Sequence, residues 1–251
     1  MELNNSVEKP IFSIIATAVR VGIWEAYYNS IVNDISFPFE IVFVGDKRPD
    51  FQLPSNFRHI YSEVKPVQCL EIAARAAKGE YLFDATDDLT FSPRFFDYLV
   101  NTAQRINDKN VILIPSLARH GKVKKGSFRI KKHDKHSPIV GMLSFTKRET
   151  WYDLGGLDRN FISVWHNHDL KLRLIERGGS VVHVKEAITE EIDTNFSILL
   201  RNVSGVEDKA FLLSCWYDAL DVFSHKRLKT FEPFIDDGLL TVSQGNSGKW
   251  G

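Results

Sequence analysis

The sequence has few cysteines, no excess of charge and no long apolar run. Its two cysteines, Cys69 and Cys215, cannot build a disulfide framework, so we expect buried free thiols in a reducing compartment. Lysine plus arginine and aspartate plus glutamate number 32 each, which leaves no global field to attract nucleic acid or an anionic membrane. No run approaches the roughly 18 apolar residues of a membrane span, and residues 1–10 lack the apolar core of a signal peptide. We expect a cytoplasmic enzyme with no nucleic-acid partner and no membrane span.

What the chain does contain is a series of apolar runs that alternate with helical patterns. Residues 11–19, 39–44 and 81–85 are near-continuous apolar runs, typical of strands that are buried on both faces. Between them, the spacing of apolar residues predicts helices over 24–32 and 67–78. This order predicts an α/β fold with a mostly parallel sheet flanked by helices.

The second half of the chain is more varied. Ser92 is expected to cap a helix over 94–106. In residues 119–136, eight of the eighteen residues are Lys or Arg, which indicates an exposed hairpin or mobile loop that either clamps phosphates or is simply solvated. From about residue 191 an apolar stripe predicts a helical C-terminal extension, so we divide the chain into a main domain, 1–190, and an extension packed on it, 191–251.

The densest chemical signal lies in residues 79–93, G-E-Y-L-F-D-A-T-D-D-L-T-F-S-P. Asp84, Asp87 and Asp88 follow or end the apolar run, where a carboxylate is costly unless a cation meets it. Ligands of open α/β sheets bind at the carboxyl ends of the strands, and Mg²⁺ and Mn²⁺ are commonly held by carboxylates plus substrate phosphates. The pattern therefore favours a metal that carries phosphate over a helix cap or solvated loop. Asp84 is either a second partner at that site or a buried structural acid.

This stretch resembles the segment with the acidic DxD-type motif in family-2-like glycosyltransferases of the GT-A fold. The block W-Y-D-L-G-G-L-D-R-N-F at 151–161, followed by H-N-H-D-L-K-L-R-L at 166–174, is similar to that family's acceptor-side signature. The resemblance covers about residues 10–190. It implies a GT-A (Rossmann-like) fold, a Mn²⁺ or Mg²⁺ cofactor, and transfer of a sugar from a nucleoside-diphosphate sugar to a glycan or other hydroxyl acceptor. Inversion is the expected outcome, and retention stays open because Asn167 stands at the usual position of the base.

The resemblance also implies roles for residues on the donor side. Asp88 matches the metal-coordinating carboxylate, and Asp87 is assigned to the donor ribose or sugar. Thr86 stands where many members have the first Asp of the motif, a departure that weakens metal binding. Thr17 matches the residue beneath the nucleobase, and Asp46 matches the acid that binds the base or ribose.

The acceptor-side motif departs further from the family pattern. Asn167 stands where inverting members commonly have the catalytic base, and an amide cannot take a proton. Asp169 is the first candidate for the base, although an acid at the start of a helix explains it equally well. His168 is the second, because the ordinary pKa of imidazole suits base work near neutrality. Trp165 either stacks on an acceptor sugar or packs in the core.

Other classes fit less well. A sugar-nucleotide pyrophosphorylase needs a glycine-rich phosphate loop after the first strand, where this chain has A-T-A-V-R-V-G. An NAD-dependent oxidoreductase needs G-x-G-x-x-G, which follows none of the predicted strands. The alternative that stays open is a non-catalytic GT-A module that binds a nucleotide or glycan, because Thr86 and Asn167 both depart from the motif.

Overall fold

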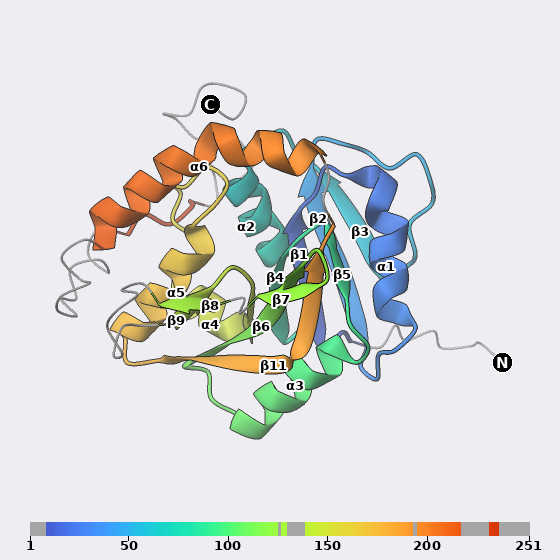
Figure 1. Ribbon diagram of the computed structural model, residues 1–251, viewed down its shortest axis with the longest axis horizontal. Coiled ribbons are helices and arrows are strands. Elements are labelled where there is room, and N and C mark those ends of the chain that lie inside the picture. The colour runs from blue at the N-terminus through green and yellow to red at the C-terminus, as the bar shows by residue number, and fades with distance from the viewer. Residues whose placement is uncertain (1–8, 125–126, 130–138, 193–194, 217–230, 236–251) are drawn as a thin grey trace.

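The computed structural model describes residues 9–124, 127–129, 139–192, 195–216 and 231–235. These form a curled mixed sheet with helices on both faces (Figure 1). The strand order is β3-β2-β1-β4-β10-β6-β11-β5, β7 pairs with β6 beside this path, and β8 pairs with β9. The strands are β1 (Phe12–Thr17), β2 (Phe39–Gly45), β3 (Phe57–Tyr61), β4 (Tyr81–Thr86), β5 (Leu89–Phe91), β6 (Val111–Arg119), β7 (Lys122–Lys124), β8 (Ser127–Arg129), β9 (Ile139–Gly141), β10 (Ser144–Lys147) and β11 (Ser180–Glu191).

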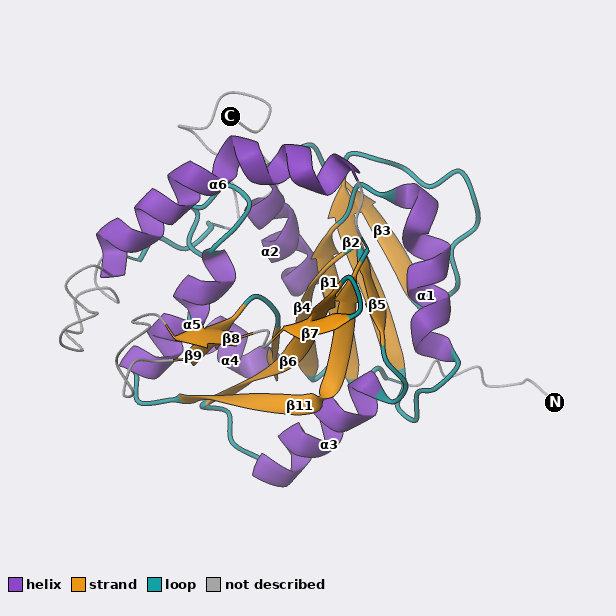
Figure 2. Ribbon diagram, viewed as in Figure 1, coloured by secondary structure: helices purple, strands orange, loops and turns teal. Residues whose placement is uncertain are grey.

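Helices alternate with the strands, as Figure 2 shows by colour. They are a short 3₁₀ turn, η1 (Val21–Ile23), and α1 (Trp24–Val32), α2 (Pro66–Ala76), α3 (Phe95–Ile106), α4 (Arg148–Asp153), α5 (His166–Glu176) and α6 (Asn195–Trp216). The predicted α/β architecture is confirmed. The proline that begins α2 suits a first helical position, where its missing N–H leaves no bond unmade.

The parallel half of the sheet explains the apolar runs of the sequence. β2, β1 and β4 run parallel in register, so that Thr17 lies beside both Val44 and Thr86. Successive side chains of a strand point to opposite faces. Accordingly Ile14 packs in one buried cluster with α1 and α3, and Ile15 packs in the other with α2 and α5. Because both faces are covered, every position of β1 up to Ala16 must be apolar or hydrogen-bonded.

The start of α3 differs from the prediction. Arg94, not Ser92, is the residue before the helix, and it adopts a left-handed conformation with φ of 59°. The hydroxyl of Ser92 instead accepts a hydrogen bond from the backbone N–H of Ile188 on β11, at 3.3 Å. The Ser92 carbonyl accepts one from Phe95, at 3.1 Å. The serine therefore ties the turn to the neighbouring strand and does not cap the helix.

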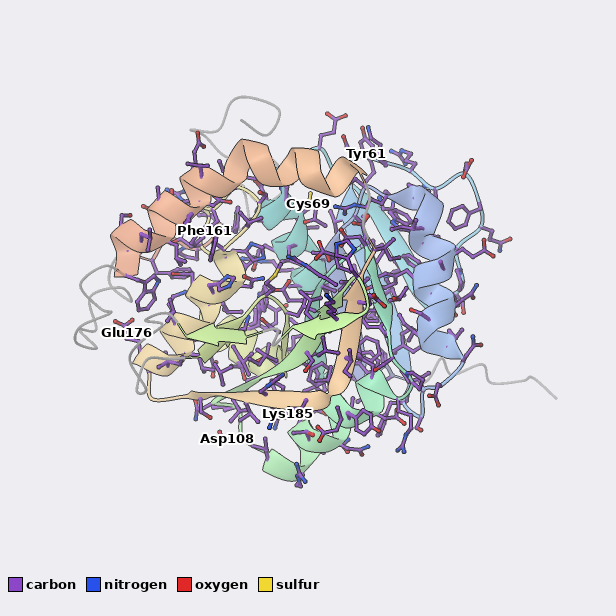
Figure 3. All side chains as sticks on the ribbon, viewed as in Figure 1. Tyr61, Cys69, Asp108, Phe161, Glu176 and Lys185 are labelled. Atoms are coloured by element: carbon purple, nitrogen blue, oxygen red, sulfur yellow. The ribbon has the colours of Figure 1, made fainter. Side chains whose placement is uncertain are left out.

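The C-terminal part packs on the rest of the chain through α6, which Figure 1 shows lying across one end of the molecule above α2 and α5. Phe161, labelled in Figure 3, packs against Phe211 of α6 with ring centroids 4.9 Å apart. Residues 217–230 and 236–251 lie outside the described residues, so the division at 190/191 stays a prediction. In the described part of the chain, no helix combines the length and apolarity needed to cross a membrane.

Two smaller expectations can be compared with the structure. Neither cysteine is in a disulfide; Cys69 is buried, whereas Cys215 is partly exposed. The basic segment begins as a hairpin, because β6 turns at His120 and Gly121 into the antiparallel β7. Residues 125–126 and 130–138 of that segment lie outside the described residues.

Candidate active site

The carboxyl ends of β1, β2 and β4 meet at one edge of the sheet, and the predicted donor residues follow these three ends. The loop after β1 lies close against the end of β2. A Cβ atom at Gly45 would lie 2.0 Å from the carbonyl oxygen of Ala18, so only glycine fits there. The structure therefore brings Asp46 beside the loop that contains Arg20, a residue to which the sequence analysis gave no role.

Asp87 organises that loop. Its Oδ2 accepts hydrogen bonds from the backbone N–H groups of Val19 and Arg20, both at 2.7 Å, and from Trp24 Nε1 at 3.2 Å. Its Oδ1 accepts one from Arg20 Nη1, and the residue is 0% exposed. Burial raises the pKa of Asp87, and the Arg20 guanidinium opposes this rise. The carboxylate thus fixes the loop after β1 onto the end of β4.

Asp88 is held from the same side. Its Oδ2 lies 3.2 Å from Nη2 of Arg20, and its side chain is 4% exposed. Its backbone carbonyl accepts a hydrogen bond of 2.7 Å from the N–H of Ile192, just after β11. The cation that meets the acidic pair within the described structure is therefore an arginine from the first loop. Arg20 and Asp87 lie 67 positions apart in the sequence, so no local pattern could have predicted their contact.

Of the other predicted donor residues, Asp46 lines an open pocket of about 870 Å³. Arg20, Asp46, Lys47 and Arg48 line it. Asp46 is partly exposed and lies 3.5 Å from the ammonium group of Lys47. The guanidinium of Arg48 stacks over the ring of Tyr61, 4.1 Å from its centroid.

The two predicted threonines differ in their surroundings. Thr86, the last residue of β4, is exposed. Thr17 donates its hydroxyl to the carbonyl of Pro66 at 2.5 Å, which ties β1 to the start of α2. Thr17 therefore lies at the predicted edge with its hydroxyl engaged in the fold.

On the acceptor side, the predicted helix begins at His166, three residues before the expected start. Asp169 is 0% exposed and accepts hydrogen bonds from Arg173 Nε and Trp216 Nε1, both at 2.8 Å. Arg173 in turn donates to the carbonyls of Leu154 and Gly156, the latter at 2.6 Å. Asp169 and Arg173 therefore join α5, the Gly-Gly turn and α6 into one unit.

The two histidines beside Asp169 are also buried. Burial lowers the pKa of His166 to about 3 and that of His168 well below its ordinary value, with the Lys171 ammonium adding to both effects. The ring of Trp165 lies 4.8 Å from that of His168. Both imidazoles are therefore neutral at pH 7, and Trp165 packs on one of them.

Lys171 and Asp84 form a buried pair beneath this motif. The sequence analysis left the role of Asp84 open. Lys171 Nζ donates to Ser144 Oγ at 2.6 Å and to the carbonyl of Asn167 at 3.0 Å. Burial lowers its pKa to about 7 and raises that of Asp84 to about 7, while each charge opposes the other's shift. Asp84 Oδ2 lies 4.0 Å from His166 Nε2. Asp84 thus belongs to a cluster that links β4, β10 and α5.

Asp88 could hold a divalent metal only together with ligands that a substrate supplies. Among the described residues, no group of three or more His, Cys, Asp or Glu side chains could hold a metal ion. Such ions are also held by one or two carboxylates together with substrate phosphates. Asp88 fits that single-carboxylate arrangement, whereas Asp87 is committed to four hydrogen bonds. A metal that arrives with its own phosphate ligands is therefore compatible with this edge.

No protein-family model matches the sequence, and no curated protein matches it significantly. Solved structures do match. GalNAc-T7 with UDP, GalNAc and Mn²⁺ superposes with a TM-score of 0.60 at 13% identity, covering 93% of this chain and 56% of that one. The mannosyltransferase PcManGT of Pyrobaculum calidifontis with GDP-Man and Mn²⁺ gives 0.57 at 16% identity, covering 83% and 65%. Residues 1–349 of TarS from S. aureus give 0.54 at 11% identity, covering 76% and 63%.

These likenesses establish the fold. The chain has the GT-A fold of glycosyltransferases, as the resemblance implied. It spans 56% to 65% of the length of the three structures, at identities that carry no information about substrates.

Proposed function

We propose that this chain is a metal-dependent glycosyltransferase, which moves a sugar from a nucleoside-diphosphate sugar to an acceptor hydroxyl. The observation that carries the proposal is the edge of the sheet where Arg20 and Asp46 line an open pocket and Arg20 also contacts Asp88, on a GT-A fold. Two of the matching structures hold a nucleotide or nucleotide sugar together with Mn²⁺, which supports the same class of donor and cofactor here.

The donor half of the proposal uses the residues at the carboxyl ends of β1, β2 and β4. Asp46 binds the ribose or base of the nucleoside, and Thr17 lies beneath it at the end of β1. Asp88 holds Mn²⁺ or Mg²⁺ against the diphosphate. When bound, that ion supplies Lewis-acid stabilisation of the charge that develops on the leaving group. Asp87 acts from behind by fixing the loop after β1, and Thr86 is exposed at the same edge for contact with the donor sugar.

The acceptor half concerns the His-Asn-His-Asp motif. Asp169 and His168 are the two candidates for the base, and their contacts differ. Both carboxylate oxygens of Asp169 accept hydrogen bonds within the fold, so its contacts favour a positioning role. Burial lowers the pKa of His168 well below its ordinary value, so its imidazole is neutral at pH 7 but is a weaker base than an exposed histidine. Asp169 and His168 stay the two candidates for the base, and Trp165 beside His168 is the proposed surface for an acceptor sugar.

The first test is thermal stability in the presence of UDP, GDP, dTDP, CDP and ADP, each with Mn²⁺ and with EDTA. A ligand at about 100 times its Kd stabilises the folded state by about 2.7 kcal/mol, which raises the Tm of a domain of this size by roughly 5–10 °C. We expect one nucleotide to give a Mn²⁺-dependent rise that Asp88→Asn abolishes. No rise with any nucleotide would contradict the donor-site proposal.

A non-catalytic module that binds nucleotide or glycan is the second candidate, because Thr86 and Asn167 replace expected acids. The two candidates differ in turnover of the donor. A transferase hydrolyses its nucleotide sugar slowly when no acceptor is present, whereas a pure binding module releases no nucleotide. Release of UDP or GDP from the stabilising nucleotide sugar, lost in Asp88→Asn, supports the transferase.

A further inference from the structure

Arg20 lies at the place where the proposed function puts a metal. Its Nη1 donates to Asp87 and its Nη2 lies 3.2 Å from Asp88 Oδ2. The guanidinium therefore bridges the two adjacent carboxylates of the acidic motif. Its side chain is 14% exposed and lines the pocket together with Lys47 and Arg48.

The loop does not depend on this side chain for its position. The backbone N–H groups of Val19 and Arg20 donate to Asp87 Oδ2 whatever side chain residue 20 carries. Trp24 Nε1 donates to the same oxygen. The guanidinium can therefore leave Asp88 while the loop keeps its anchor on Asp87.

The charges around the pocket favour an exchange of partners. Among the described residues, three bases and three acids line it, and Asp87 and Asp88 behind Arg20 bring the acids to five. A diphosphate entering this excess of negative charge needs an additional cation. A divalent ion on Asp88 would lie beside the Arg20 guanidinium and repel it. The planar fork of an arginine matches phosphate oxygens, so the incoming diphosphate offers Arg20 another anion.

We propose that Arg20 occupies the metal seat on Asp88 until the donor arrives, and then binds the diphosphate while the metal takes Asp88. The inference rests on the proposed function, because it assigns a diphosphate ligand and an entry order to the same site. It makes Arg20 a substrate-binding residue. It also makes the metal a poor ligand of the protein when no diphosphate is present.

The test is a titration of the protein with MnCl₂ alone, in which free Mn²⁺ is measured by electron paramagnetic resonance. We expect weak binding by the wild type and binding at least about tenfold tighter by Arg20→Gln, because the competing charge is gone. Arg48→Gln is the matched control: it removes the same charge from the same pocket, and Arg48 contacts the Tyr61 ring. It should change Mn²⁺ affinity far less.

Two further variants keep the test decisive. Adding Asp88→Asn to Arg20→Gln should abolish the gain, which places the new binding on Asp88. Arg20→Lys keeps the charge without the fork, so it should keep weak Mn²⁺ binding and weaken binding of UDP or GDP in the presence of Mn²⁺. Circular dichroism confirms that each variant is folded.

The outcomes separate the inference from the function beneath it. Equal Mn²⁺ affinities for wild type, Arg20→Gln and Arg48→Gln would overturn the competition at Asp88. Tighter Mn²⁺ binding by Arg20→Gln with unchanged nucleotide affinity in Arg20→Lys would overturn the diphosphate half. If the wild type binds no nucleotide under any condition, the proposed function fails, while a gain in Arg20→Gln still demonstrates the competition for Asp88.

Discussion

The donor side and the acceptor side of this molecule each pair a fully buried aspartate with an arginine, but the two arginines differ in exposure. Asp87 and Asp169 are both 0% exposed. Arg20, the partner of Asp87, is 14% exposed at the rim of a pocket, whereas Arg173, the partner of Asp169, is 0% exposed. The same type of ion pair therefore has two different roles. The donor-side arginine, Arg20, can exchange partners with a ligand, whereas the acceptor-side arginine, Arg173, is part of the core.

The surroundings of Arg173 explain why it cannot exchange. Besides Asp169, its guanidinium donates to the carbonyls of Leu154 and Gly156 and lies 4.0 Å from the centroid of the Phe231 ring. Gly156 has φ of +72°, a conformation that glycine adopts without strain. The Gly-Gly turn of the sequence motif thus presents a carbonyl to the arginine. A motif that resembles a catalytic signature is here also a packing device.

The largest effect should come from breaking the buried ion pair between Asp169 and Arg173. Asp169→Asn keeps the shape of the side chain but leaves the Arg173 charge buried without its carboxylate. Removing one partner of a buried pair destabilises a protein by about 3–5 kcal/mol. We expect a loss of that size in the free energy of unfolding, measured by urea denaturation.

The matched control is an exposed pair on the same side of the molecule. Arg159 and Glu232 lie 2.6 Å apart, with side chains 44% and 49% exposed. Arg159→Gln should change stability by about 0–1 kcal/mol, because solvent screens such pairs. Full stability in Asp169→Asn, together with lost sugar transfer, would contradict the positioning role and restore Asp169 as the base.

A second test concerns how α6 holds the loop before the acceptor motif. Asp208 accepts three backbone hydrogen bonds of 2.8 Å, from Ile162, Ser163 and Val164. Burial raises the pKa of Asp208, and these three bonds oppose the rise. Asp208→Asn keeps one acceptor oxygen and removes the charge, so we expect a loss of about 3 kcal/mol in unfolding free energy. A loss below 1 kcal/mol would show that α6 does not anchor this loop.

The sequence predicted the parallel half of the sheet well, because burial on both faces leaves a continuous apolar run. Strands at 11–19, 39–44 and 81–85 and the helix at 24–32 are all present within a few residues. The helix expected from about residue 191 is present as α6, which begins at Asn195.

What could not be predicted is which residues meet across the chain. Arg20, the partner of Asp87, lies in the loop after β1, and Trp216, which also donates to Asp169, lies at the end of α6, 67 and 47 positions away. Such contacts follow from the topology and leave no periodic signal. The acid-rich edge was visible in the sequence, but the cation that meets it was not.

The smallest of these effects is a pH dependence of stability that reports on the buried region around Asp169 and His168. The folded pKa of His168 lies well below that of an unfolded histidine, near 6.5, because burial disfavours the charged form. Above pH 6.5 the histidine is neutral in both the folded and the unfolded protein, so its burial carries no pH-dependent penalty. Below pH 6.5 the unfolded protein binds a proton that the folded protein does not, and stability is lost. Each pH unit between about 6.5 and the folded pKa lowers the free energy of unfolding by about 1.4 kcal/mol. His168→Gln lacks this penalty, so the variant should gain stability relative to wild type as the pH falls from 7 to 5.

Asp84 provides the opposite sign as a control. Burial raises its folded pKa to about 7, so the folded state favours the protonated carboxyl, and stability falls as the pH rises from about 4 towards 7. Asp84→Asn resembles the protonated form, so this variant should gain on wild type as the pH rises, where His168→Gln gains as it falls. Both differences are measured by urea denaturation at pH 5, 6 and 7. If stability depends on pH in the same way in both variants, neither His168 nor Asp84 is neutral in the folded protein. The buried region around Asp169 would then be as open to solvent as the donor side.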